Sequence, residues 1–203
     1  LWGKTVGIVG LGYIGKWVAQ FAQAFNARIL ATELNATTAL PWVQLVDLPR
    51  LLAVSDVVTI HLPLNAATEQ IIDAEAIAAM KPGAILVNFS RGKQVDDQAI
   101  VGLLQTGHLG CYIVDVYSFE PPDFQNDILF AYPNLWETGR LLPTPHLGAS
   151  TVEAQASVAE SLIDQALGFF QNGQMPWGAN FPGFSLKRQG ESRLIVFHPD
   201  VAG

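Results

Sequence analysis

Three separate segments of this chain each contain a side chain that could transfer a proton or bind an anion. These side chains are Arg91 in "ILVNFSRGKQVDD", Glu120 in "YIVDVYSFEPP" and His146 in "PTPHLGAST". An arginine can hold a carboxylate through two hydrogen bonds and polarise an adjacent carbonyl. A histidine can accept the proton of a secondary alcohol during hydride transfer, and a carboxylate beside it would fix its tautomer. Each residue by itself is more often solvated or structural, so their arrangement in space decides the question.

A glycine-rich turn near the start of the chain indicates a nucleotide site. Gly10, Gly12 and Gly15 form G-x-G-x-x-G between a strand-like run and the helical pattern of Lys16–Phe25. In that context the first glycine makes the tight turn, and the second lets a pyrophosphate approach the backbone. The third glycine lets helix and strand pack closely, and the helix N-terminus attracts phosphate. We therefore predict that this turn binds a dinucleotide.

An acidic residue follows the turn at a suitable distance. Glu33 in "ILATELN" lies 18 residues beyond Gly15, at the end of the second predicted strand. A carboxylate there can accept hydrogen bonds from both ribose hydroxyls and would repel a 2′-phosphate. The sequence thus favours NAD over NADP, and a solvated Glu33 in an ordinary strand–turn–helix is the alternative.

The elements that would position these residues alternate along the chain. Short apolar runs without polar alternation suit strands that are buried on both faces. The predicted strands are Val6–Val9, Arg28–Ala31, Val57–Ile60, Ala84–Asn88, Cys111–Val116 and Leu141–Leu142. The predicted helices are Lys16–Phe25, Leu48–Ala53, Ala74–Met80 and Asp97–Gln105. This order predicts an α/β fold with a doubly wound parallel sheet of the Rossmann type.

The three candidate catalytic side chains follow successive strands of this sheet. The carboxyl ends of parallel strands lie at one edge, where ligands bind in open α/β sheets. The glycine turn follows the first strand and belongs to the same edge. We therefore expect Arg91, Glu120 and His146 to converge beside a bound dinucleotide.

Composition narrows the class of protein. With 203 residues, of which 50% are hydrophobic, the chain can bury one substantial core. A net charge of −7 with 11 Lys plus Arg argues against a nucleic-acid partner. No apolar run approaches the roughly 20 residues of a membrane helix, and no cluster has metal-ligand spacing. The single cysteine, Cys111, excludes an intrachain disulfide and fits a cytoplasmic protein.

The composition of the sequence changes toward its end. Ser150-Thr-Val-Glu153 has the form of a capping box and predicts a long amphipathic helix that ends near Gly173. Apolar residues recur at helical spacing along it, at Val158, Leu162, Ala166 and Phe169. The next segment is rich in Gly, Pro and Asn, as linkers are, and an incomplete extra strand follows. We expect both ends of the chain to be cut from something longer.

Five segments, in this order, resemble the NAD-binding domain of the D-2-hydroxyacid dehydrogenases. They are "GIVGLGYIG", "HLPLNAAT", "MKPGAILVNFSRG", "GHLGCYIVDVYSFEPP" and "TPHLGASTVEAQ". The resemblance implies an NAD-dependent enzyme with a small 2-hydroxy acid as substrate. It also implies that Arg91 binds the substrate carboxylate and carbonyl, and that Glu120 and His146 form the acid–base pair.

The resemblance further implies a set of cofactor contacts. Asp115 matches the residue that holds the nicotinamide carboxamide, and two segments around His61 and Ser90 match the lining of the cofactor site. The implied cofactor-binding residues are Gly10, Gly12, Tyr13, Ile14, Gly15, Glu33, His61, Leu62, Pro63, Asn88, Ser90, Arg91, Asp115 and His146.

The tail resembles a junction found in bacterial family members that oxidise 3-phosphoglycerate to 3-phosphohydroxypyruvate in serine biosynthesis. There an NAD domain is joined to a regulatory ACT domain, whose H-x-x-x-x-G turn His198 to Gly203 would match. The implied organisation is an NAD domain at 1–173 that lacks the N-terminal part of the substrate domain, a linker at 174–190 and a truncated ACT start at 191–203. Such enzymes are homo-oligomers, dimeric through the NAD domain and tetrameric at full length. The fragment alone would bind NAD with little or no turnover.

Alternatives stay open at this point. The chain could come from a dehydrogenase of another 2-hydroxy acid, such as glycerate or lactate, or from a non-catalytic NAD sensor. The segment "LWETGRLLP" before "TPH" is an insertion relative to the family pattern. It is either a harmless surface loop or a displacement of His146.

Overall fold

The structure is a computed structural model that describes residues 1–33, 40–121, 127–176, 183–185 and 190. Contacts within the chain divide it into two compact units, Leu1–Gly148 and Ala149–Gly203. The predicted domain boundary at residue 173 stays a prediction. Among the described residues, no helix has the length and apolar character needed to cross a membrane.

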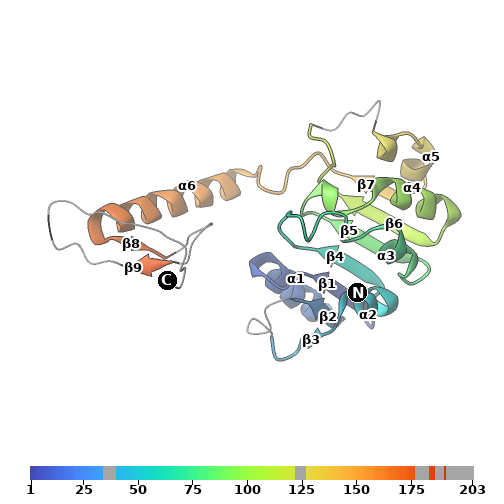
Figure 1. Cartoon of the computed structure of the whole chain (residues 1–203), viewed down its shortest axis with the longest axis horizontal. Coiled ribbons are helices and arrows are strands. Elements are labelled where there is room, and N and C mark those ends of the chain that lie inside the picture. The colour runs from blue at the N-terminus through green and yellow to red at the C-terminus, as the bar shows by residue number, and fades with distance from the viewer. Residues whose placement is uncertain (34–39, 122–126, 177–182, 186–189, 191–203) are drawn as a thin grey trace, which may run out of the picture. The chain divides into compact units, whose positions relative to one another are not determined.

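The first unit is built on a parallel sheet that has seven strands in the described part of the chain, in the order β3-β2-β1-β4-β5-β6-β7 (Figure 1). The strands are β1 (Thr5–Val9), β2 (Arg28–Thr32), β3 (Gln44–Leu45), β4 (Val57–Ile60), β5 (Ala84–Asn88), β6 (Leu109–Val114) and β7 (Leu141–Pro143). The strand order runs outward from β1 in both directions. This confirms the predicted doubly wound, Rossmann-type sheet and places a topological switch point beside β1.

Helices cover the two faces of the sheet, because successive side chains of a strand point to opposite faces. From β1, Val6 and Ile8 pack with Ala19 and Ala22 of α1 (Tyr13–Ala24). On the opposite face, a Cβ on Gly7 would overlap Leu51 of α2 (Leu48–Val54). The main core lies on that second face, where α3 (Ala74–Ala78) and α4 (Asp97–Thr106) follow α2.

Local capping signals begin the helices of the second face. The carboxylates of Asp47, Asp73 and Asp96 accept backbone N–H bonds at the starts of α2, α3 and α4, at 2.8 to 3.0 Å. Each such cap stabilises its helix by about 1 kcal/mol. The last of these helices, α4, ends at Gly107, whose φ of 78° is left-handed and favours glycine.

Several predicted boundaries were wrong by a few residues, and some elements were missed. The strand predicted at Cys111–Val116 is observed at Leu109–Val114, because the chain leaves the sheet at Asp115 to form a loop. Burial alternates along β5 rather than being complete, since α1 covers the first face only near β1 and β2. The short strand β3 and the helix α5 (Pro133–Glu137) carry too weak a pattern to be predicted.

The second unit contains α6 (Val152–Leu167), a π-helical turn (Gly168–Asn172) and an antiparallel pair of β8 (Gln174–Met175) and β9 (Phe184–Ser185). The N-cap of α6 is Thr151, whose hydroxyl accepts the Ala154 N–H at 3.1 Å, and not the predicted Ser150. The helical segment, including the π-helical turn, is capped at Gly173, near which its end was predicted. Its apolar side chains are exposed, Val158 at 56% and Leu162 at 62%.

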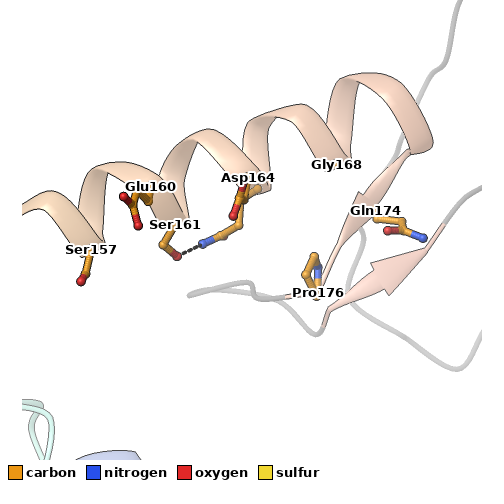
Figure 2. A pocket seen from close by; sticks show the side chains of 8 residues that line it. Ser157, Glu160, Ser161, Asp164, Gly168, Gln174 and Pro176 are labelled. Carbon is orange, nitrogen blue, oxygen red and sulfur yellow. Dashed lines mark hydrogen bonds between the residues drawn. The ribbon is translucent and has the colours of Figure 1, made fainter.

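An open pocket of about 390 Å³ lies along α6 and β8 in this second unit (Figure 2). Its lining residues include Glu160, Ser161 and Asp164. None of the predicted site residues lines it. The segment His198 to Gly203, which resembles an ACT turn, lies outside the described residues.

Candidate active site

The candidate residues come from loops at one edge of the first unit's sheet. The glycine turn follows β1, His61 follows β4 and Arg91 follows β5. Glu120 lies in the loop after β6, and His146 lies after β7. Since all of these strands are parallel neighbours, their carboxyl ends meet at one edge. The structure therefore brings these segments together at one edge of the sheet, as expected.

The glycine turn has the conformation that its sequence requires. Gly10 has a φ of 98°, and a Cβ there would lie 2.8 Å from the carbonyl oxygen of His61. A Cβ on Gly15 would overlap the Gly10 carbonyl oxygen, so helix α1 can approach β1 only with glycine here. At Gly12 the situation differs, because no protein atom lies within 4 Å of an added Cβ.

The start of α1 is open to an anionic ligand. Gly12 is the N-cap of this 12-residue helix and supplies no side-chain hydrogen bond to its first turn. The side chains of Tyr13 and Ile14 are 82% and 63% exposed. Free N–H groups and the helix dipole at such a terminus attract phosphate oxygens. The turn therefore fits the pyrophosphate of a dinucleotide.

Glu33 is fixed beside this turn. Its Oε2 accepts the backbone N–H of Leu11, between the first two glycines, at 2.8 Å. The carboxylate of Glu33 thus lies at the switch point, where the ribose of a dinucleotide binds in such sheets. A carboxylate oxygen can accept more than one hydrogen bond, so ribose hydroxyls can still bind to it.

The segment after β4 forms the next part of the edge. His61 contacts Thr59 Oγ1 through Nε2 at 3.0 Å, and burial lowers the pKa of its imidazole to about 4. The ring is therefore neutral at pH 7. The carbonyl of Leu62 accepts hydrogen bonds from Ser90 Oγ at 2.5 Å and from Gln94 Nε2 at 2.9 Å. These bonds join the loop after β4 to the loop after β5.

Two buried amides fix the backbone around Arg91. Asn88 Nδ2 donates to the Arg91 carbonyl at 2.9 Å, and Asn88 Oδ1 accepts the Ser90 N–H at 3.1 Å. Gln94 Oε1 accepts the Arg91 N–H at 3.3 Å. The guanidinium itself is exposed and donates through one nitrogen to the Ser90 carbonyl at 2.7 Å. Its other N–H groups are available to a ligand in solvent.

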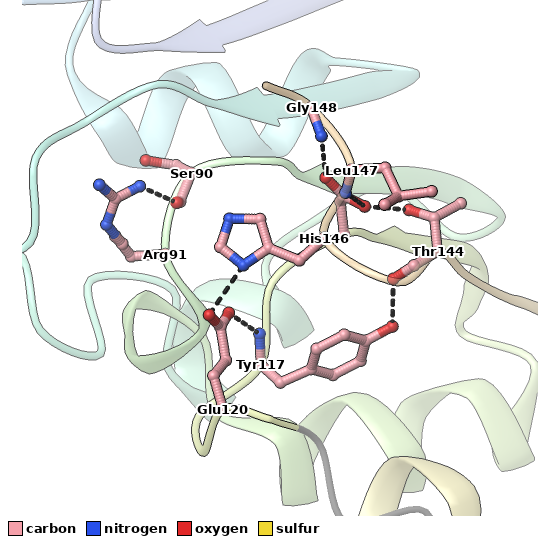
Figure 3. Close-up of polar contacts among 9 residues, drawn as sticks. Ser90, Arg91, Tyr117, Glu120, Thr144, His146, Leu147 and Gly148 are labelled. Carbon is pink, nitrogen blue, oxygen red and sulfur yellow. Dashed lines mark hydrogen bonds and ion pairs between the residues drawn. The ribbon is translucent and has the colours of Figure 1, made fainter. Parts of the chain in front are cut away.

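Glu120 and His146 form the closest functional pair of the site. Glu120 Oε2 lies 2.7 Å from His146 Nδ1, and both side chains are partly exposed (Figure 3). An ionised carboxylate only accepts hydrogen bonds, so Nδ1 carries the proton. In the neutral ring Nε2 is then the proton acceptor. The pair is thus arranged as a general base held by a carboxylate.

The backbone of His146 is held in a left-handed conformation by Asp115. His146 has a φ of 55°, which costs free energy for a residue with a Cβ. The buried carboxylate of Asp115 accepts hydrogen bonds from three groups around it: Thr144 Oγ1 at 2.6 Å, Leu147 N at 3.2 Å and Gly148 N at 3.3 Å. Asp115 therefore shapes the His146 loop, a role that the sequence did not reveal.

The insertion before His146 is built into the fold. It forms the end of α5 and the turn into β7, where Trp136 packs edge-on against Phe130 at 5.0 Å. Arg140 donates to the Leu104 carbonyl near the C-terminus of α4 at 2.7 Å. The Glu120–His146 contact is made in the presence of this segment. The segment is therefore not the surface loop of the first reading, since Leu135 and Leu141 are buried, and it does not displace His146 from Glu120.

A second acidic residue lies behind the Glu120 loop. Asp97 Oδ2 accepts the Ser118 hydroxyl at 2.7 Å. Burial raises the pKa of this carboxyl to about 6, with smaller contributions from Asp127 and Asp96. Sequence reasoning missed Asp97, at the start of α4, and Gln94, in the turn before it, because polar residues in such positions are usually solvated. Their burial depends on which loops pack above them.

Comparisons with known proteins agree with this geometry. A family model described as "D-isomer specific 2-hydroxyacid dehydrogenase, NAD binding domain" matches residues 1–148. The D-3-phosphoglycerate dehydrogenase of Escherichia coli (strain K12) is 35% identical over 208 aligned positions, which cover 99% of this chain and 48% of that protein. The D-3-phosphoglycerate dehydrogenase of Mycobacterium tuberculosis (strain ATCC 25618 / H37Rv) is 41% identical over 169 positions, covering 80% and 30%.

Solved structures show the same likeness. The crystal structure of a glyoxylate reductase from Paecilomyes thermophila aligns with a TM-score of 0.74 at 34% identity, covering 86% of this chain and 51% of that one. The chain spans about half the length of the first curated relative and of this solved structure.

Proposed function

The chain belongs to the D-isomer specific 2-hydroxyacid dehydrogenases, and from that premise we propose that it is the NAD-binding part of an enzyme that oxidises a D-2-hydroxy acid to the 2-oxo acid. The observation that most supports this is the 2.7 Å contact between Glu120 and His146. It is made at the sheet edge that also carries the glycine turn. A base and a dinucleotide cradle at one edge are what hydride transfer from an alcohol requires.

NAD is the cofactor of this family's domain, and when bound it accepts a hydride from the substrate carbon. The open N-terminus of α1 at Gly12 would hold the pyrophosphate, and Glu33 would accept the ribose hydroxyls. A 2′-phosphate would meet the negative charge of Glu33, so we propose a preference for NAD over NADP. Asp115 Oδ2, which accepts the Gly148 N–H, would also take the N–H of the nicotinamide carboxamide.

Arg91 and His146 would act on different groups of the substrate. The exposed guanidinium of Arg91 would bind the carboxylate and polarise the developing carbonyl. His146 Nε2 would accept the hydroxyl proton, and Glu120 would stabilise the imidazolium that results. In the reverse direction the same imidazolium would return the proton to the carbonyl oxygen.

For the substrate we propose 3-phosphoglycerate, oxidised to 3-phosphohydroxypyruvate in serine biosynthesis. The two curated relatives carry the name D-3-phosphoglycerate dehydrogenase, and one of them aligns over 99% of this chain. A glyoxylate reductase and D-lactate dehydrogenases are also among the similar structures, so glycolate and lactate are substrates to compare, together with glycerate. Activity on glycerate or lactate alone would exclude 3-phosphoglycerate.

Calorimetric titration of the 203-residue chain with NAD and NADP tests the cofactor site directly. We expect NAD to bind and NADP to bind more weakly. Replacing Glu33 with Ala removes two charge-assisted hydrogen bonds to the ribose, so NAD affinity should fall about 10- to 100-fold. The exposed Glu137, outside the site, gives the matched control Glu137→Gln. Equal affinity for both cofactors in the unmodified chain would contradict the role of Glu33.

We also propose that the protein is a homo-oligomer that associates through the NAD domain. Trp17 and Phe21 on α1 and Phe25 at its C-cap are 49%, 61% and 64% exposed, and the first two rings stack at 6.0 Å. A fully buried aromatic side chain covers about 150–250 Å², so at these exposed fractions the three offer on the order of 300 Å². A stable dimer needs about 800 Å² per partner, so they would form the centre of a larger interface with a second copy.

A further inference from the structure

Tyr117 lies among all three candidate catalytic segments. It is the third residue after β6 and is only 4% exposed, with its ring against Phe130 at 5.6 Å. The hydroxyl of a buried tyrosine usually forms a hydrogen bond. The partner of the Tyr117 hydroxyl lies in one of the candidate catalytic segments. The contacts of Tyr117 reach the segments of Glu120, His146 and Arg91 in turn.

The backbone of Tyr117 holds Glu120. Its N–H donates to Glu120 Oε1 at 3.1 Å, while Glu120 Oε2 contacts His146 Nδ1 at 2.7 Å. The two oxygens of one carboxylate are thus divided between Tyr117 and the histidine ring, as Figure 3 shows. Rotation of the Glu120 side chain would break both bonds, so the N–H of Tyr117 selects the rotamer that meets His146.

The hydroxyl of Tyr117 holds the His146 segment. It donates to the Thr144 carbonyl at 2.6 Å (Figure 3). Thr144 lies two residues before His146, and its own hydroxyl donates to Asp115. Burial raises the pKa of the Tyr117 phenol to about 12, so it stays a donor over the pH range in which imidazole titrates. The side chain of Tyr117 therefore bonds to the His146 segment beside the bonds that Asp115 makes there.

The carbonyl side of Tyr117 lies against the Arg91 segment. A Cβ on Gly92 would overlap the carbonyl carbon and oxygen of Tyr117 and the N of Ser118. Only glycine can follow Arg91 at this close approach. Ser118 extends the same contact, since its hydroxyl donates to Asp97 at the start of α4.

We propose that Tyr117 is a positioning residue that fixes the Glu120 and His146 loops in register, acting through its hydroxyl bond to Thr144. It needs no contact with substrate or cofactor for this role. Its value to catalysis rests on the proposed function, whereas its effect on the Glu120–His146 pair can be measured without ligand. The pair holds the proton on Nδ1 of His146, and free imidazoles of histidine prefer the proton on Nε2. The tautomer of His146 therefore reports how well Glu120 is placed.

The test is ¹⁵N NMR of the histidine rings of the chain in alkaline solution, where imidazoles are neutral. The wild-type chain should hold His146 mainly as the Nδ1–H tautomer. In Tyr117→Phe the ratio of Nδ1–H to Nε2–H should fall about fivefold, which corresponds to a net hydrogen bond of about 1 kcal/mol. Glu120→Ala gives the ratio without the carboxylate, and Tyr132→Phe, at a half-buried tyrosine outside the site, should match wild type.

Two further measurements make the test decisive. In Glu120→Ala, Tyr117→Phe should change the ratio no further, because the hydroxyl acts on the Glu120–His146 bond, which this variant lacks; an additional change would contradict this. Hydrogen exchange of the Tyr117 amide, measured without altering Tyr117, should be faster in Glu120→Ala than in wild type, and an unchanged rate would contradict the bond. A wild-type ratio in Tyr117→Phe would overturn the proposal. Failure of wild type to bind NAD would instead refute the proposed function.

Discussion

Asp97 offers a direct test of the electrostatics behind the Glu120 loop. Its carboxyl has a pKa of about 6 in the folded protein against an ordinary value of 3.8, chiefly because burial disfavours the charged form. One pKa unit corresponds to about 1.4 kcal/mol, so the difference amounts to about 3 kcal/mol. A raised folded pKa means that the folded state binds the proton more tightly than the unfolded state. The associated stability is present below about pH 4 and is lost as the pH rises through about 6.

The substitution Asp97→Asn removes this titration and keeps an oxygen that can accept the Ser118 hydroxyl, which lies 2.7 Å away in the native protein. The variant should therefore gain stability relative to wild type as the pH rises from 4 to 7, by about 2–3 kcal/mol in total. Above pH 7 the difference should be constant. Below pH 4, where the carboxyl is protonated in both states, the two proteins should differ little.

Urea unfolding followed by tryptophan fluorescence, at half-unit steps between pH 4 and 8, measures the difference. The exposed Glu137→Gln variant is the control for the loss of one surface charge. Parallel stability profiles for Asp97→Asn and wild type over this range would refute the reasoning, because they would mean that Asp97 is not desolvated.

Three other substitutions test separate parts of the structure. Tyr112→Phe should raise the free energy of unfolding by about 1 kcal/mol, because the buried Tyr112 hydroxyl makes no hydrogen bond of good geometry and its polar neighbour Asn88 is already bonded to Arg91 and Ser90; unfolding that is unchanged or easier would contradict this. Phe21→Glu should convert a dimer into monomers in sedimentation velocity at micromolar concentration, because it charges the exposed face of α1. His146→Gln, in the protein that carries out the proposed reaction, should lower kcat by about 10²- to 10⁴-fold; unaltered function would favour an NAD sensor.

Much of the fold was readable from the sequence, because its signals are local. The apolar runs of β1, β2, β4 and β5 were predicted to within one residue at each end. The glycine turn was predicted from spacing alone, and its Gly10 and Gly15 are required by φ and by close backbone contact. Such features depend on residues that are neighbours in the chain, so their pattern survives in the sequence.

The candidate site was only partly readable. Residue type identified Arg91, Glu120 and His146, and the rule that parallel strands end at one edge predicted that their loops would gather. The prediction needed no side-chain detail. For the same reason it could not say which oxygen meets which nitrogen, or whether the insertion would displace the histidine.

The sequence by itself determined six of the seven described strands of the large sheet, the starts of α2, α3 and α4, the dinucleotide turn and the kinds of side chain at the edge of the sheet. Only the tertiary structure decided that Tyr117 joins the Glu120 loop to Thr144, that Asp115 holds the His146 backbone, and that burial raises the pKa of Asp97. These contacts join residues about 20 to 30 positions apart. Their distances follow from the register of β5, β6 and β7 and from the packing of loops, which no local pattern encodes.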